Sequence, residues 1–129
     1  MNAPFGAGAR GQVSRLLTPA FTSPAPKGAF NGSYDEEGLI VPGWVEDVKN
    51  RTEDPMLAMV VLGNGQHESL KLERAVVDLL GRRQSWQVDK QRMRDLPLRE
   101  VARGAVGDAC RTLELCWYLR GRLERTEYL

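Results

Sequence analysis

The chain has 129 residues, of which 42% are hydrophobic and 27% charged, and its formal net charge is +1. This length corresponds to about one domain of ordinary size. No run approaches the ~18 apolar residues of a membrane span, and the first residues lack the apolar core of a secretory signal. Two cysteines, Cys110 and Cys116, and one histidine, His67, offer little material for a disulfide framework or a His-based metal centre. We therefore expect a small soluble cytoplasmic protein that needs no cofactor.

The charge is unevenly distributed along the chain. Residues 1–30 carry a net +3, residues 31–55 a net −5, and residues 56–129 a net +3. The most basic stretch is 82–103, where seven basic residues face three acidic ones for a net charge of +4. Most of these bases are arginine, which favours bidentate contacts with phosphate or carboxylate groups. The alternative interpretation of this stretch is an ordinary solvated helical face.

Residues 1–33 have the composition of a tail. Prolines and glycines interrupt every helical or strand period in this segment, except for a possible turn of helix over residues 12–17. Such a segment buries too little apolar surface to offset the entropy lost on ordering. We therefore predict an irregular or disordered N-terminal tail over 1–33 and a helical domain over 34–129. The apolar residues of the tail leave a second interpretation open, in which it orders against a partner or against its own domain. These residues are Phe5, Leu16, Leu17, Phe21 and Phe30.

The helical domain is expected to be all-α. A short extended segment is predicted at residues 39–41, with a turn at Pro42 and Gly43. Asp54 and Pro55 are favoured residues for a helix start, and the following run, residues 56–62, is apolar all round and expected to be buried. A second helix is predicted over 68–80, ending at Gly81, and a third over 85–94. Together these signals predict a core of four or five helices over residues 54–126.

The C-terminal part resembles a degenerate helix-turn-helix. A helix from Leu98 would end at Gly104 and Gly107, and Asp108 would cap the last helix, with Arg111 near its start. The alternative is two core helices joined by a glycine-rich corner. In the last helix, the core face is expected to carry Ala109, Leu113, Cys116 and Trp117, and to be widened by Leu115, Leu119 and Leu123. In the DNA-binding interpretation, the contacts come from Lys90, Arg92, Arg94, Arg99, Arg103 and Arg111.

Catalysis is not indicated by any local pattern. His67 has no neighbouring serine or cysteine nucleophile in a known motif, and Cys110 and Cys116 lie on different sides of one helix. Residues 63–65 lack the spacing and the lysine of a phosphate-binding loop. The protein is therefore not expected to be an enzyme, and no metal is expected.

From Glu37 onward, the chain resembles the phage late-gene antitermination proteins of the Q class. The resemblance covers about 90 residues. It implies a protein that binds DNA at a late promoter through a helix-turn-helix-type module and contacts RNA polymerase. Some members hold zinc through paired cysteines that this chain lacks, so the resemblance implies no metal here. The features that carry it are Gly38-Leu39-Ile40 with Pro42, the apolar helix at 56–62, Val76-Val77-Asp78, the helix-turn-helix-like residues 98–113, and the terminal Arg120-Gly121-Arg122-Leu123-Glu124-Arg125.

Two classes of function remain open from the sequence. The first is a DNA-binding phage or prophage transcription regulator, acting as an antiterminator on host RNA polymerase, with duplex DNA as its main partner. The second is a non-catalytic protein–protein adaptor, such as a phage structural or connector protein or an inhibitor of a host enzyme. The oligomeric state is not indicated. Convergence of the bases of 82–103 with Arg111 on one face would favour the first class.

Overall fold

The computed structural model describes residues 6–63, 71–82 and 90–125. Its secondary structure is predominantly helical, as expected, with two short strands, β1 (Lys27–Gly28) and β2 (Arg51–Glu53), in the described ranges. The chain forms two compact units, residues 1–53 and residues 54–129. This division differs from the predicted boundary after residue 33, because residues 34–53 hydrogen-bond to the segment that was expected to be a tail.

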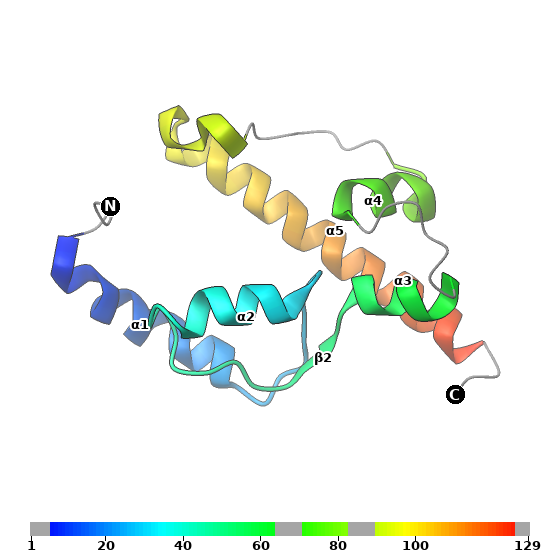
Figure 1. Cartoon of the computed structure of the whole chain (residues 1–129), viewed down its shortest axis with the longest axis horizontal. Helices are drawn as coiled ribbons and strands as arrows, with labels where there is room; N and C mark the ends of the chain where they lie inside the picture. Colours follow the sequence, from blue (N-terminus) through cyan, green and yellow to red (C-terminus); the bar gives the residue numbers. More distant parts are fainter. Residues whose placement is uncertain (1–5, 64–70, 83–89, 126–129) are drawn as a thin grey trace. The chain divides into compact units, whose positions relative to one another are not determined.

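The prediction of an irregular tail is wrong. Helix α1 occupies Gly6–Thr22 and includes Pro19 (Figure 1). Contacts within the first unit help to hold this helix: the backbone N–H of Glu46 donates to Thr18 Oγ1 at 3.3 Å, and that of Lys49 donates to the carbonyl of Phe21 at 2.9 Å. The Arg10 guanidinium also lies 5.2 Å from the centre of the Trp44 ring. These tertiary contacts oppose the weak helix propensity of the glycines and the proline.

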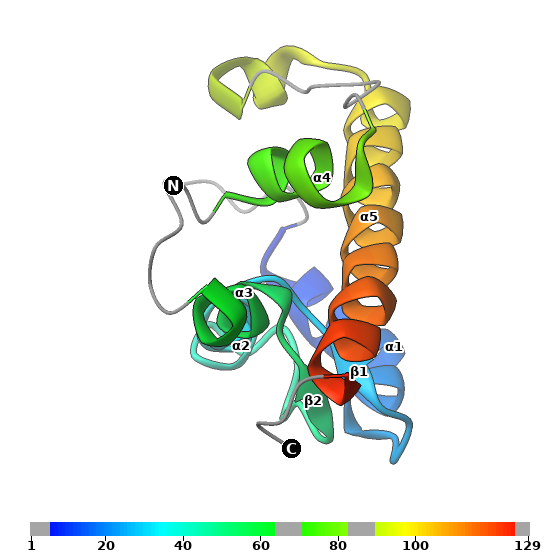
Figure 2. The same ribbon diagram turned by 90° about the vertical axis from the view of Figure 1, so that its right-hand side faces the viewer.

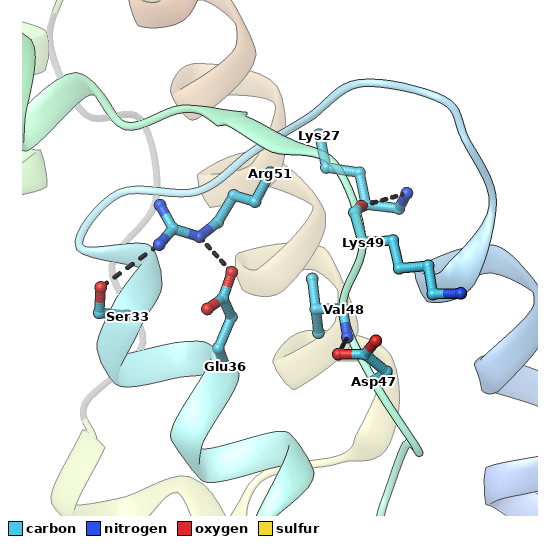
Figure 3. A network of polar contacts seen from close by, with 7 residues as sticks. All are labelled: Lys27, Ser33, Glu36, Asp47, Val48, Lys49 and Arg51. Atoms are coloured by element: carbon cyan, nitrogen blue, oxygen red, sulfur yellow. Dashed lines mark hydrogen bonds and ion pairs between the residues drawn. The ribbon is translucent and has the colours of Figure 1, made fainter.

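The two strands of the first unit pair in parallel, and Lys27 lies opposite Arg51. The Lys27 ammonium donates to the carbonyls of Ser23, Ala25 and Lys49 at 2.8–2.9 Å. Figure 3 shows the neighbouring polar network, in which Arg51 forms an ion pair with Glu36. Because β1 has only two residues and β2 only three, the pairing depends on these side-chain contacts as well as on the backbone.

Helix α2 occupies Gly32–Ile40, so the prediction of an extended segment at residues 39–41 is wrong. Gly32 is buried, and a Cβ added there would lie 2.6–2.9 Å from the side chain of Arg51. The absence of a side chain at Gly32 therefore allows the start of helix α2 to lie close to the side chain of Arg51. The predicted turn after it is confirmed, since the N–H of Gly43 donates to the carbonyl of Ile40 at 3.0 Å and Gly43 has a φ of +84°.

The second unit begins where the sequence predicts a helix. Helix α3 occupies Pro55–Gly63, and the carboxylate of Asp54 accepts a hydrogen bond from the N–H of Met56 at 3.0 Å. Helix α4 occupies Leu72–Leu80 and ends, as predicted, at Gly81 with a φ of +64°. The start of the helix predicted from residue 68 lies outside the described residues. A 3-10 helix, η1 (Lys90–Asp95), overlaps the second half of the helix predicted over 85–94, whose first residues are not described.

Helix α5 occupies Leu98–Glu124 without a break. The predicted turn at Gly104 and Gly107 is therefore wrong, and so is the helix-turn-helix that depended on it. Alanine and arginine, which are good helix formers, stand beside the two glycines together with valine and aspartate, and each glycine in a helix interior costs only about 1 kcal/mol relative to alanine. The core contacts of the C-terminal half of α5 with α3 and α4 outweigh this cost.

The core of the second unit lies between α5 and the pair α3 and α4, which pack along one side of it (Figure 2). Helix α3 contributes Pro55 and Met59, and α4 contributes Ala75 and Val76. Helix α5 contributes Thr112, Leu115, Cys116 and Leu119, and the hydroxyl of Thr112 donates to the carbonyl of Asp108 at 2.8 Å.

The predicted core face of α5 is confirmed only in part. Leu115 and Leu119, which were expected to widen this face, are buried. Cys116 is buried, but Ala109 and Leu113 are exposed, and Trp117 is 63% exposed. Ala109, Leu113 and Trp117 are four residues apart, and so are Leu115 and Leu119. The spacing alone therefore does not show which side of the helix is buried. The expectation that residues 56–62 are buried all round is also wrong, because Leu57, Val60 and Val61 are exposed.

Because α5 is continuous, Gly107 lies inside a helix, and the effect of its replacement on stability can be predicted. A Cβ added to this glycine meets no atom within 4 Å. Gly107→Ala should therefore raise the free energy of unfolding by about 0.5–1 kcal/mol, the difference in helix propensity between the two residues. Urea denaturation followed by circular dichroism measures it. A loss of stability instead would indicate a glycine-specific backbone at this position.

Candidate nucleic-acid interface

The candidate interface lies at the junction of η1 and α5. Arg92 and Arg94 belong to η1, and Arg99 and Arg103 belong to the first turns of α5. All four side chains are exposed. We call these four arginines the basic end of the second unit.

The chain geometry explains why these arginines reach solvent. Residues 99 and 103 are four apart on a helix, so their side chains project about 40° from each other around the axis. The core face of α5 is centred on Leu115 and Leu119, and neither arginine lies on it. The first turns of α5 therefore present their basic side chains away from the core.

The electrostatic environment of the basic end is mixed. Asp95 and Glu100 lie within the same segment and are exposed. Among the described residues, however, the four arginines form no ion pair with either of them or with any other acid. An exposed guanidinium without a carboxylate partner keeps its donors available for a phosphate group.

Arg111 is not part of this group. It lies in the middle of α5, is half-buried, and donates through Nη1 to Glu114 Oε1 at 2.9 Å. The Glu114 carboxylate also pairs with Arg82, whose Nη1 is 3.1 Å from Oε2. Arg111 thus stands in a three-membered ion-pair network that joins α5 to the residue after the C-terminal end of α4, instead of at the start of a recognition helix.

The remaining predicted site residues are only partly described. The backbone of Lys90 begins η1, while its side chain lies outside the described part of the structure. His67 also lies outside the described residues, as do Arg83 and Asp89 of the basic stretch. The structure therefore places Arg92, Arg94, Arg99 and Arg103 in one short segment and separates Arg111 from them.

The sequence reasoning missed two features of this unit. One is the network of Arg82, Glu114 and Arg111, whose only local signal was the three-residue spacing of Arg111 and Glu114. The other is an exposed row of apolar side chains along α5, which includes Val106, Leu113 and Trp117. From the sequence, Leu113 and Trp117 are expected in the core and Val106 in the predicted turn.

Comparison with known proteins gives no relative for this chain: no family model matches it, and no curated protein or solved structure is significantly similar to it. Within the described residues, no helix is both long enough and apolar enough to cross a membrane.

Proposed function

We propose that this protein binds duplex DNA through phosphate contacts made by the basic end of the second unit. The observation that carries the proposal is the grouping of Arg92, Arg94, Arg99 and Arg103, all exposed and without an ion-pair partner among the described residues. Arginine donors of this kind match the oxygen atoms of the DNA backbone. Because α5 is continuous, the proposal includes no recognition helix and predicts little discrimination between base sequences.

A role in transcription regulation is the biological context that we propose for this DNA binding. It is supported by the resemblance of residues from Glu37 onward to the Q-class antitermination proteins. In this context host RNA polymerase is the second partner, and the protein acts as an antiterminator in a phage or prophage. DNA binding by the basic end can be tested without assuming this context.

The test is a fluorescence-polarisation titration of the full chain on a random-sequence duplex at several salt concentrations. Each phosphate contact should contribute about −0.9 to the slope of log affinity against log salt, through release of counterions. Arg103→Ala removes one such contact, so it should weaken binding to every duplex and make the slope shallower by about 1.

Arg74→Ala is the matched control, because it removes the same charge from an exposed position in the same unit. Arg74 already pairs with Asp78 at 2.9 Å, so its loss should leave the slope nearly unchanged. Absence of DNA binding by the wild type at low salt, or equal effects of the two variants, would contradict the proposal.

The alternative function is a non-catalytic protein–protein adaptor, such as a phage connector protein or an inhibitor of a host enzyme. A specific observation favours it: Leu57, Val60 and Val61 share one face of α3 and are exposed. Exposed apolar side chains gathered on one helical face are typical of protein interaction sites. A chain that does not bind duplex DNA at low salt would be explained by this alternative.

A further inference from the structure

Helix α5 has a second apolar face besides the one in the core. Val106 is 62% exposed, Leu113 48% and Trp117 63%, and the small residues Ala102 and Ala109 are exposed as well. Their spacings of four, three, four and four residues place all five within an arc of about 80°. We call these five residues the α5 stripe.

The stripe is turned away from the core of the second unit. The buried residues of α5, among them Leu115 and Leu119, are centred about 110° around the helix from the stripe. Helices α3 and α4 pack on the core side (Figure 2). A second apolar stripe at nearly heptad spacing is typical of helices that pack against a further helix.

Charged residues stand at the two ends of the stripe. Arg99 lies at its N-terminal end and Glu124 at its C-terminal end, each within about 40° of the centre of the stripe. Neither side chain has an ion-pair partner among the described residues. They are 25 residues apart in sequence, which corresponds to about 38 Å along the helix axis. Arg120 also lies within the arc of the stripe, between Trp117 and Glu124, and it makes an interaction within its own chain.

We propose that the α5 stripe binds the α5 stripe of a second copy of this chain, in an antiparallel pair about a two-fold axis. With the axis between Arg111 and Thr112, Arg99 meets Glu124 of the partner subunit, and the contact occurs twice. The same alignment places Val106 opposite Trp117 of the partner subunit, so the large side chains pack against one another. A two-fold interface of this kind is self-complementary.

The charges decide the direction of the pair. In a parallel arrangement the two Arg99 side chains would approach each other, and so would the two Glu124 side chains, which is repulsive. In the antiparallel arrangement both contacts between Arg99 and Glu124 are attractive, while Arg103 at the edge of the pair lies level with Arg120 of the partner subunit. The pairing leaves Arg92, Arg94 and Arg103 of each copy available to phosphate, and it does not depend on DNA binding.

The first test is sedimentation equilibrium of the full chain over a range of concentrations. The wild type should show a monomer–dimer equilibrium, and Leu113→Glu should be monomeric throughout, because it places a charge in the centre of the stripe. Val77→Glu is the matched control, since Val77 is 45% exposed but lies on α4. It should dimerise like the wild type. A monomeric wild type at the highest concentration, or equal losses in the two variants, would overturn the proposal.

The second test addresses the antiparallel alignment by charge reversal. Arg99→Glu and Glu124→Arg should each weaken the dimer by about tenfold, because each turns two weak attractions into repulsions. The double variant should recover wild-type dimerisation, since it restores both contacts with their signs exchanged. Dimerisation that is unchanged in the single variants, or that is not recovered in the double variant, would refute this alignment. Circular dichroism checks that every variant is folded.

Discussion

Leu115→Ala is expected to lower the free energy of unfolding by about 2–5 kcal/mol, the range for truncation of a large buried aliphatic side chain. Leu115 has no exposed surface and lies on the side of α5 that packs against α3 and α4. The substitution removes three carbon atoms and leaves a cavity where the helices meet. Because packing here is the main link between α5 and the two shorter helices, the loss should appear in the whole second unit.

Trp117→Ala is the informative control for this prediction. It removes a larger side chain only two residues away, but that side chain is mostly exposed, so its loss should change the stability by less than about 1 kcal/mol. Urea denaturation followed by circular dichroism, at a protein concentration low enough to keep the chain monomeric, measures both variants. A larger loss for Trp117→Ala than for Leu115→Ala would show that the sides of α5 have been exchanged.

Ala105→Pro is expected to lower the free energy of unfolding by about 3 kcal/mol or more. Residue 105 lies between the two glycines of α5, in the middle of a continuous helix. A proline there removes the hydrogen bond from its N–H to the carbonyl of Val101, and its ring collides with that carbonyl. The variant should lose helical signal along with stability.

Ala105→Ser provides the comparison, because it also replaces the alanine but keeps the backbone N–H. Its cost should be about 0.5 kcal/mol, from helix propensity alone. If a turn were present at this position, proline would be tolerated nearly as well as serine. Similar stabilities of the two variants, measured by urea denaturation, would therefore contradict the continuous helix.

The local signals of the sequence were sufficient for several helix ends. Asp54 caps α3 through its own carboxylate, and Gly81 ends α4 in the left-handed conformation that glycine adopts without strain. These interactions involve residues close together in the chain, so the nearby sequence contains all the participants. The exposure of Arg99 and Arg103 could be anticipated for a similar reason, because the positions of these two residues along the helix determine the direction in which their side chains project.

The grouping of the candidate site was only partly predictable. Arg92, Arg94, Arg99 and Arg103 lie within twelve residues of one another, and this proximity alone brings them together. Arg111 was added to them on the assumption of a turn, whereas in the structure it pairs with Glu114. The partner that completes this network, Arg82, is 32 residues away from Glu114, and no local pattern indicates such a contact.

Local sequence signals were sufficient to predict the predominantly helical character of the chain, the start of α3, the end of α4 and the basic character of the segment before α5. The tertiary structure was needed to show that residues 6–22 are helical, that α5 passes through its glycines, and that, of the residues expected in the core, Leu115 is buried whereas Trp117 is exposed. In a helix interior, glycine costs about 1 kcal/mol and proline about 3 kcal/mol relative to alanine. Packing or hydrogen bonds with distant segments can exceed these costs. Which of two apolar sides of a helix enters a core depends on where its neighbours lie, and that information is not local in the chain.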